Sequence, residues 1–530
     1  MAARRKYFGW GSEGEGLSED EKAFALATNR ARFGRADFDT VAVAKEADIR
    51  LAAPRIAPPA SLAAICSSDH HDRLTHTYAQ SFPDYVRAMA GDFAPAPDVV
   101  ATPRSEDDVA AVLDWAGGAQ ASVTIYGGGS SVCGGTEPRI ARGQKAAISL
   151  DMRGMGQVVE VDKTSRAALI DGGTYGPALE AQLKPHGVTL RHFPQSFEYS
   201  TLGGWIATRS GGHFATLYTH IDDLVESLRI VTPKGLIETR RLPGSGAGPS
   251  PDRMFIGSEG ILGVITRAWV RLQDRPKFRA GGAVRFKDFF TAARALRAVS
   301  QSGLYPANCR ILDPQEAKNT GAGDGSFALM VLAFESGDHD VGAWMTRALE
   351  CCRDHGGDTG EIGGADAHRA GAADRWRTAF IRMPYIREMT LPMGIIDDTF
   401  ETSITWDRFE AFHDAVKSAT AQAVKDVSGQ TGNVTCRVTH VYPDGPAPYF
   451  SFHALGRHGQ LAEQWLAIKS RALDAVIDNG GTVTHHHAVG RDHRPWYDRQ
   501  RPPLFAEALR AAKKTLDPQG LLNAGVLIDV

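Results

Sequence analysis

Three clusters of glycine, serine and threonine, all within one stretch of about 180 residues, constrain this chain most strongly. They are Gly127–Ser131, Pro194–Gly212 and Gly257–Thr266, and each adjoins a run typical of a β-strand. Glycine tolerates positive φ and lets the backbone approach a ligand closely, so successive amides can converge on an anion. The clusters have neither the spaced-glycine dinucleotide fingerprint nor the Lys-Ser/Thr of a P-loop. One such cluster could be a surface loop, but three in one unit favour a long cofactor that the backbone holds at several points.

The pattern of strands and helices divides the chain into four parts. Residues 1–94 are turn-rich and partly helical, and residues 95–275 alternate short strands with helices in an α+β unit. From 276 to 480, longer amphipathic helices alternate with strands, which predicts an antiparallel sheet covered by helices. Residues 481–530 form a C-terminal segment that we expect to return to the cofactor site. A chain of 530 residues is too long for a single hydrophobic core, in agreement with this division.

Charge and cysteine usage exclude several classes of protein. The formal net charge of −3, without any basic run, offers no electrostatic basis for binding nucleic acid. No apolar run approaches the ~20 residues that a membrane-spanning helix requires. The six cysteines are scattered without CxxC pairs, as in reduced intracellular proteins. We therefore expect a soluble cytoplasmic protein.

A run of three histidines, His485-His486-His487, is the most prominent polar feature of the second half. In an extended segment, His485 and His487 would share one face and His486 would point to the other. Such imidazoles can act as bases, hydrogen-bond partners or metal ligands, and a solvated polar turn is the structural alternative. Because no carboxylate or cysteine accompanies them at ligand spacing, we expect no metal site. The basic segment that follows, 488–496, indicates an anionic ligand.

Three further side chains are candidates for a site. Tyr449 lies in an aromatic strand and faces opposite to Phe450 and Phe452. Arg387 and Arg310 each lie among apolar or aromatic neighbours, and a buried arginine requires a partner. Sheet packing for the tyrosine and salt bridges for the arginines are the structural alternatives.

Three motifs resemble those of the vanillyl-alcohol-oxidase/p-cresol-methylhydroxylase type of FAD flavoprotein. They are Pro194-Gln-Ser196 with the Ser-Thr-Leu-Gly-Gly of 200–204, the stretch Gly257–Thr266, and the tail Leu-Asp-Pro-Gln-Gly-Leu-Leu-Asn-Ala-Gly of 516–525. The resemblance implies an α+β fold, with a two-subdomain FAD-binding domain and an α+β cap domain that carries the helix-covered antiparallel sheet. Members often tether FAD through a histidine at the position of Ser130, so this chain is expected to bind FAD non-covalently. The residues implied to hold the cofactor are Gly127, Gly128, Gly129, Ser130, Ser131, Pro194, Gln195, Ser196, Thr201, Gly204, Thr208, Ser210, Gly211, Glu259, Leu262, Gly263, Ile265 and Asn523.

Five stretches are similar to the alkylglycerone-phosphate synthase family, also called alkyldihydroxyacetonephosphate synthases. They are Tyr7–Gly11, Tyr385–Glu388, Phe400–Arg408, Cys436–Thr439 and the triple histidine. The resemblance implies that the acyl group of an acyl-dihydroxyacetone phosphate is exchanged for a fatty alcohol. In that family the exchange runs through a covalent adduct at flavin N5 and involves no net redox change.

The same resemblance implies roles for the candidate side chains. Arg387 would bind the substrate phosphate, and Tyr449 would act as acid/base. His486 and His487, beside His485, would handle the substrate proton. The remaining arginine, Arg310, would support the flavin or the site.

One departure keeps a second function open. Gln195 occupies the position at which the family carries an aspartate, and a neutral amide cannot accept a proton in the same way. The alternative is an FAD-linked oxidase or dehydrogenase that oxidises a phenolic, alcohol or 2-hydroxy-acid substrate by hydride transfer to N5. For either function we expect a small, lipid-like or anionic substrate, peripheral membrane contact and a homodimer.

Overall fold

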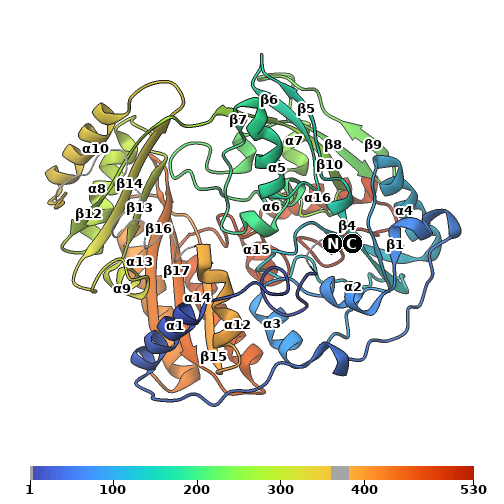
Figure 1. Cartoon of the computed structure of the whole chain (residues 1–530), viewed down its shortest axis with the longest axis horizontal. Helices are drawn as coiled ribbons and strands as arrows, with labels where there is room; N and C mark the ends of the chain where they lie inside the picture. Colours follow the sequence, from blue (N-terminus) through green and yellow to red (C-terminus); the bar gives the residue numbers. More distant parts are fainter. Residues whose placement is uncertain (1–3, 360–380, 530) are drawn as a thin grey trace.

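The strands of the N-terminal half form two small sheets. The computed structural model describes residues 4–359 and 381–529. One sheet has four strands in the order β1-β2-β4-β3, with the last three parallel, and the other has five antiparallel strands in the order β5-β6-β10-β8-β9 (Figure 1). Their bounds are β1 Cys66–Ser67, β2 Val99–Ala101, β3 Ala121–Tyr126, β4 Ala146–Asp151, β5 Val158–Asp162, β6 Ala167–Asp171, β8 Val225–Thr232, β9 Gly235–Glu238 and β10 Val264–Arg271. This pair of sheets supplies the loops that carry the glycine clusters.

Local sequence signals account for the ends of the helices in this half. Helix α4 (Glu106–Ala119) begins after Ser105, whose hydroxyl accepts a hydrogen bond of 3.1 Å from the backbone N–H of Asp108. Helix α5 (Gly176–Leu183) continues as a 3-10 turn and stops at Gly187, which has a φ of +78°. The other helices are α2 His70–Thr75, α3 Phe82–Met89, α6 Leu202–Thr208 and α7 Pro251–Phe255, and a two-stranded pair joins β7 Val188–Thr189 to β11 Gln273–Asp274.

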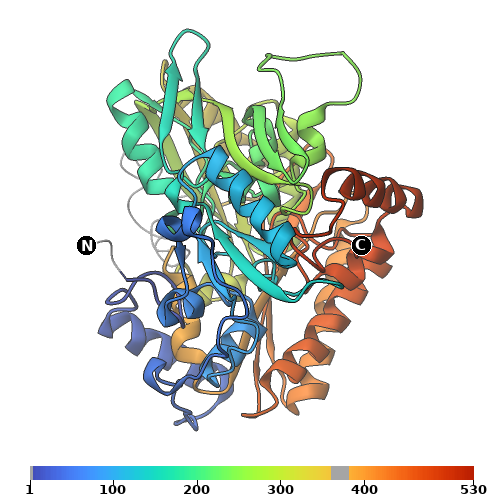
Figure 2. The same cartoon turned by 90° about the vertical axis from the view of Figure 1, so that its right-hand side faces the viewer.

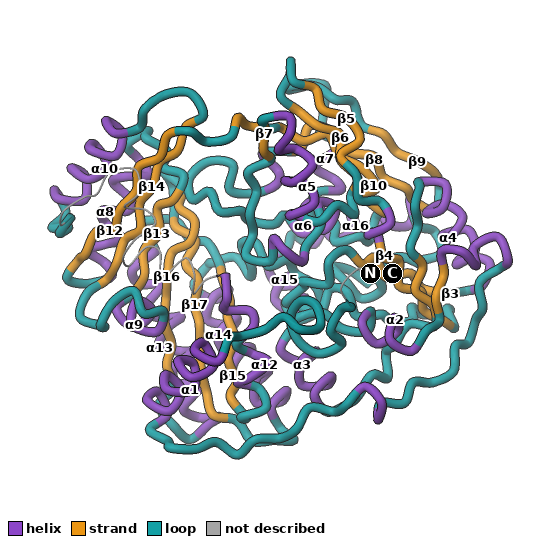
Figure 3. The backbone as a smooth tube through the Cα atoms, viewed as in Figure 1, coloured by secondary structure: helices purple, strands orange, loops and turns teal. Residues whose placement is uncertain are grey.

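The second half is built on a six-stranded antiparallel sheet in the order β12-β14-β13-β16-β17-β15. Helices α8, α10, α13 and α14 cover one face, and α8 and α10 lie on its outer side in Figures 1 and 3. The predicted helix-covered antiparallel sheet is therefore confirmed. The bounds are β12 Phe278–Phe286, β13 Asn308–Leu312, β14 Ala328–Ser336, β15 Ile395–Glu401, β16 Asn433–Val441, β17 Pro446–Leu455, α8 Phe289–Gln301, α9 Pro314–Asn319, α10 Gly342–Asp354, α12 Arg387–Thr390, α13 Phe409–Ser428 and α14 Leu461–Asp478.

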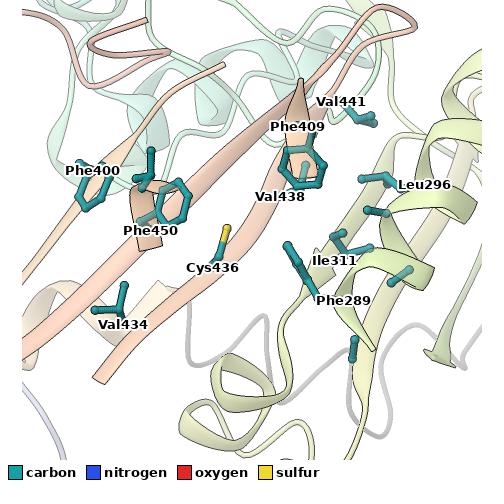
Figure 4. Packing of buried hydrophobic residues seen from close by; sticks show 14 of the residues in the cluster. Phe289, Leu296, Ile311, Phe400, Phe409, Val434, Cys436, Val438, Val441 and Phe450 are labelled. Carbon is teal, nitrogen blue, oxygen red and sulfur yellow. The ribbon is translucent and has the colours of Figure 1, made fainter. Parts of the chain in front are cut away.

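Apolar side chains between this sheet and its helices form an extensive core (Figure 4). Phe400 of β15 stacks on Phe450 of β17, with ring centroids 5.1 Å apart and planes inclined by 13°. Leu296 of α8 and Ile311 of β13 are fully buried in the same core. Because side chains alternate along a strand, the neighbour of Phe450, Tyr449, lies on the opposite face of the sheet.

The two ends of the chain pack against the N-terminal half and the six-stranded sheet. Near the start, the ammonium of Lys6 lies 2.8 Å from the carboxylate of Glu388 in α12, and helix α1 (Glu19–Phe33) follows. At the other end, α15 (Arg494–Gln500) and α16 (Pro503–Leu516) lead to the C-terminal tail, drawn in dark red in Figure 2. In this tail Leu522 pairs with Val123 of β3. Within residues 4–359 and 381–529, no helix is both long and apolar enough to cross a membrane.

Leu296 provides a test of this core. Leu296→Ala should lower the free energy of unfolding by about 2–5 kcal/mol, because it leaves a cavity in a fully buried site. The matched control is Leu504→Ala, since Leu504 is 77% exposed and should change stability by less than about 0.5 kcal/mol. Urea denaturation followed by circular dichroism measures both, and equal effects of the two substitutions would contradict the core assignment.

Candidate active site

A cavity of about 850 Å³ lies between the two halves of the molecule. This volume is within the range of small-molecule and cofactor sites. Its wall contains every residue that the sequence implied for the cofactor except Leu262. Leu262 is instead fully buried in the core of the five-stranded sheet, whereas its neighbour Gly263 lines the cavity.

The first two glycine clusters are in direct contact at this wall. A Cβ atom on Gly128 would lie 1.8 Å from the carbonyl oxygen of Tyr199, and one on Gly127 would lie 2.5 Å from Oγ1 of Thr201. Gly129 has a φ of +67°, in the left-handed region that favours glycine. On the same wall, Oγ1 of Thr136 is buried and has no hydrogen-bond partner among the described residues. The glycine backbone and this unpaired hydroxyl fit a polar, phosphate-containing cofactor.

The third cluster connects the cofactor wall to the C-terminal segment. The carboxylate of Glu259 accepts hydrogen bonds of 2.8 Å from the backbone N–H groups of Val489 and Gly490. The side chain of Asn523 donates to the carbonyl oxygen of Glu259 at 2.6 Å and accepts from the N–H of Ile125 at 2.9 Å. Burial raises the pKa of Glu259 to about 7, against the lowering effect of the two backbone hydrogen bonds. Residues far apart in the sequence thus hold the cofactor loops and the histidine segment together.

The triple-histidine segment bends around one buried carboxylate, that of Glu401 at the end of β15. The backbone N–H groups of His486 and His487 donate to Glu401 at 3.1 and 2.8 Å. The backbone N–H of His485 and the side-chain hydroxyl of Thr484 also donate to this carboxylate. Burial favours a raised pKa, but the nearby imidazoles and these hydrogen bonds hold the pKa of Glu401 below its ordinary value. The carboxylate is therefore ionised and fixes the shape of the segment.

This bend corrects the predicted orientation of the histidines. His486 and His487 line the cavity, whereas His485 lies behind them. The sequence interpretation placed His485 and His487 on one face because it assumed an extended segment. The backbone is bent instead, since three consecutive N–H groups converge on a single acceptor.

His485 belongs to a cluster of imidazoles whose other two members, His440 and His486, line the cavity. The ring nitrogens of His440, His485 and His486 lie within 4.8 Å of one another, close enough to hold a metal ion. These nitrogens are already used in hydrogen bonds, since Nε2 of His440 donates to Gly212 O at 2.9 Å and Nε2 of His485 contacts Tyr442 Oη at 2.7 Å. Burial is the main cause that lowers the pKa of all three imidazoles, so they are neutral near pH 7. We therefore interpret His485 and His486 as members of a hydrogen-bonded network against which His440 packs, and not as metal ligands.

Tyr449 lies on the cavity wall beside the histidines. Its hydroxyl donates to Thr399 Oγ1 at 3.0 Å, and the guanidinium of Arg437 lies 3.8 Å from its ring centroid. The centroid of the His486 ring is 6.1 Å from that of Tyr449, and the two planes are inclined by 30°. Burial raises the pKa of Tyr449, although the charge of Arg437 opposes this effect, so the phenol retains its proton and can donate it.

Arg387 also lines the cavity, and it is paired with two acids. Its guanidinium donates to Asp397 Oδ1 at 3.2 Å and to Asp398 Oδ1 at 3.1 Å, and also to the carbonyl oxygens of Gln80 and Asp397. The salt bridge considered for this residue from the sequence is thus present. A phosphate bound by Arg387 would have to share the guanidinium with these carboxylates.

Arg310 of β13 lies on the same wall. Its guanidinium donates to the carbonyl oxygen of His213 at 3.0 Å. Burial, with a contribution from the charge of Arg437, lowers the pKa of Arg310 to about 10, so it stays positively charged at neutral pH. The structure therefore brings Arg310, Arg387, Tyr449, His486 and His487 to one cavity.

Several residues of the site had not been predicted. Glu401, His440, Arg437 and Lys469 are buried members of it. Glu401 lies within a stretch used for the family resemblance, but its strand pattern carries no signal of its partners. The groups that donate hydrogen bonds to it lie 83 to 86 residues further along the chain, so only the folded structure identifies them.

Substitution of Gly128 tests the close packing of the cofactor loops. Gly128→Ala should reduce the FAD bound per polypeptide, because the added Cβ would collide with Tyr199 O and separate the two clusters. Gly118→Ala in α4 is the control, since nothing lies within 4 Å of its Cβ position. Flavin absorbance relative to protein, measured after gel filtration, reports the difference. Full FAD content in the Gly128 variant would contradict the assignment.

Substitution of Glu401 tests the anchor of the histidine segment. Glu401→Gln should lower stability at neutral pH by about 1.5–3 kcal/mol, because an amide cannot replace the ionised acceptor of several hydrogen bonds. Since the folded pKa lies below the ordinary value of 4.5, this stabilisation is present above pH 4.5 and is lost as the pH falls through the folded pKa. The difference in the free energy of unfolding between wild type and variant should therefore become smaller as the pH is lowered, as measured by the midpoints of denaturant unfolding. Glu410→Gln, at an exposed ion pair with Arg294, is the control and should show little effect.

Comparison with known proteins agrees with this geometry. Residues 97–240 match the family model described as FAD binding domain, and residues 275–527 match the one described as FAD linked oxidases, C-terminal domain. An alkyldihydroxyacetonephosphate synthase of Trypanosoma brucei brucei is 30% identical to the chain, covering 87% of the chain and 78% of its own length. The alkyldihydroxyacetonephosphate synthase of Dictyostelium discoideum is 31% identical, and the match covers 86% of this chain and 77% of that protein.

Solved structures show the same fold. A structure of alkyldihydroxyacetonephosphate synthase superposes with a TM-score of 0.82 at 25% identity, covering 98% of both chains. p-Cresol methylhydroxylase shares the fold with a TM-score of 0.70 at 15% identity, over 97% of this chain and 98% of its own. The expected two-part FAD-binding fold with a cap domain is thereby confirmed. This chain is an FAD-dependent enzyme that belongs to the alkyldihydroxyacetonephosphate synthase family.

Proposed function

We propose that this enzyme exchanges the acyl group of an acyl-dihydroxyacetone phosphate for a fatty alcohol. The observation that carries the proposal is the convergence of Tyr449, His486 and His487 with Arg387 and Arg310 on the cavity that also contains the cofactor loops. An acid/base pair and a phosphate-binding guanidinium are the groups that such an exchange requires. Bound FAD would supply an electron-poor ring beside them.

In this proposal the protein residues bind the substrate and move a proton. Arg387 holds the phosphate, and Arg310 adds positive charge to the same wall. His486 takes the proton from the substrate carbon next to the carbonyl, and Tyr449 donates to the leaving acyl oxygen. The fatty acid leaves, and the oxygen of the alcohol forms the new C–O bond while its hydroxyl proton passes to Tyr449. His486 then returns the first proton to carbon, so both residues are restored and the exchange has no net redox change.

The outer part of the cavity is suited to a long alkyl chain. Its wall there includes Leu17, Phe24 and Ala25 of the N-terminal region together with Met383 and Ile386. Phe24 is 57% exposed, so apolar surface continues from the cavity to the outside. These features support a lipid-like substrate and contact with a membrane surface. A homodimer, a cytoplasmic location and non-covalent binding of FAD are further predictions from the sequence, and Ser130 at the cofactor wall supports the last of them.

The second candidate is an FAD-linked oxidase or dehydrogenase. Gln195 lines the cavity where the synthase family carries an aspartate, and this substitution favours the alternative. The match of the C-terminal half to FAD linked oxidases also keeps it open. In this function the same phenol and imidazoles would bind and deprotonate an alcohol or phenol.

Two measurements on the purified holoenzyme separate these functions. The proposal requires release of fatty acid from an acyl-dihydroxyacetone phosphate, with incorporation of labelled hexadecanol into an ether product. Anaerobic bleaching of the flavin by a hydroxy acid or phenol, reversed by oxygen, with no such exchange, would instead establish the oxidase.

Substitution of Tyr449 tests its acid/base role. Tyr449→Phe should lower turnover by about 100-fold or more while FAD stays bound, because only the hydroxyl proton donor is removed. Tyr305→Phe, at a residue that is 47% exposed, is the matched control and should keep full activity. Unchanged turnover in the Tyr449 variant would remove this residue from the mechanism.

A further inference from the structure

A continuous chain of side-chain hydrogen bonds runs from His486 at the cavity towards the surface, and two of its members, His220 and Tyr442, have no role assigned above. Nδ1 of His486 lies 3.0 Å from Nδ1 of His485. Nε2 of His485 lies 3.2 Å from Nε2 of His220 and 2.7 Å from the hydroxyl of Tyr442. His220 is half-buried and lies beside Tyr218, which is 45% exposed.

The tautomers of the imidazoles in this hydrogen-bonded chain can be assigned one after another, starting from the outermost ring, that of His220. Nδ1 of His220 lies 2.9 Å from the carbonyl oxygen of Arg209, which can only accept, so this nitrogen carries the proton. Nε2 of a neutral His220 is then a bare acceptor. Two bare nitrogens would repel one another at 3.2 Å, so Nε2 of His485 must be the donor. The hydroxyl of Tyr442 can accept from the same N–H because it is placed to donate to Thr219 Oγ1 at 3.0 Å.

The same logic continues to the cavity. With its proton on Nε2, a neutral His485 has a bare Nδ1 that accepts from Nδ1–H of His486. The ionised Glu401, 3.6 Å from Nδ1 of His486, favours the same tautomer. Nε2 of His486 is therefore bare, and it has no hydrogen-bond partner within residues 4–359 and 381–529. Since His486 lines the cavity, this nitrogen is available as a base.

We propose that His220, His485 and Tyr442 form a proton relay that sets the tautomer of His486 and connects it to solvent. The relay rests on the proposed function for the identity of its substrate, whereas the tautomer assignment rests only on the hydrogen-bond contacts. Nε2 of His486 takes the substrate proton, Nδ1 of His486 passes its proton to Nδ1 of His485, and Nε2 of His485 passes its own to Nε2 of His220. Nδ1 of His220 releases a proton to water. Each ring gains and loses one proton, so all stay neutral, and reversal of the same steps returns a proton to the substrate and resets the chain.

Neighbouring groups are consistent with a chain of neutral imidazoles. Burial is the main cause that lowers the pKa values of His485 and His486, and the other imidazoles lower them further. His440, which is neutral for the same reason, packs against both rings at centroid distances of 5.0 and 5.2 Å. Arg437 adds positive charge that disfavours a trapped imidazolium on His486. A charged imidazolium is thus disfavoured at both His485 and His486.

The first test reads the tautomers of the holoenzyme and needs no substrate. Two-bond ¹H–¹⁵N spectra of ¹⁵N-histidine-labelled protein, with His486→Gln to assign the signal, should show His486 protonated at Nδ1 and bare at Nε2. In His220→Ala, this preference should weaken, because Tyr442 can then donate to Nε2 of His485 and reverse the chain. His486 protonated at Nε2 in the wild type would overturn the proposal, whatever reaction the enzyme catalyses.

The second test measures function in the same variants. His220→Ala should lower turnover by about 100-fold with FAD content and KM unchanged, and added imidazole should restore activity in a concentration-dependent manner. Tyr442→Phe, which keeps the ring but not the hydroxyl, should have a smaller effect, and His339→Ala, at a 51% exposed side chain, should have none. Full activity of His220→Ala, or a loss that imidazole does not restore while the variant still binds FAD, would overturn the relay. Absence of acyl exchange by the wild type would refute the proposed function alone, since the tautomer measurement still decides the relay.

Discussion

The arrangement of the site depends on one buried carboxylate, that of Glu401. Several hydrogen bonds from a single bend of the chain converge on it, three of them from backbone N–H groups. Loss of this carboxylate would be costly, because buried N–H groups without an acceptor do not recover the free energy of the hydrogen bonds that they made to water in the unfolded chain. The carboxylate therefore determines both the path of the histidine segment and which of its imidazoles face the cavity. It lies at the end of β15, so the six-stranded sheet positions the histidines although they are not part of it.

A second constraint ties the cofactor wall to this segment. Glu259 belongs to the third cluster, and its carboxylate is bound by the backbone of Val489 and Gly490, shortly after the histidines. Asn523 then joins the same cluster to β3, the strand that ends directly before Gly127. The cofactor loops, the histidines and the tail thus form one hydrogen-bonded unit. A shift of any one of them would move the others relative to the cofactor.

Strand β17 shows how the core and the site share the same element. Phe450 and Phe452 point into the helices, and Tyr449 and Ser451 point into the cavity. Packing of the phenylalanines against Phe400 fixes the strand, and the strand in turn fixes the phenol. Precision at the site is therefore a consequence of close packing on the opposite face of the sheet.

Local physical chemistry made much of this protein predictable from its sequence. Glycines that allow close approach identified the cofactor loops, period-2 alternation placed Tyr449 opposite the phenylalanines, and long amphipathic helices indicated a covered sheet. The orientation of His485, the partners of Arg387 and the role of Glu401 were decided only by the tertiary structure. The reason is that hydrogen bonds between different elements leave no periodic pattern in the sequence, whether the partners are 10 residues apart, as for Arg387 and Asp397, or more than 80, as for Glu401 and the histidines. The relay through His220 is of the same kind, since it joins residues 265 positions apart.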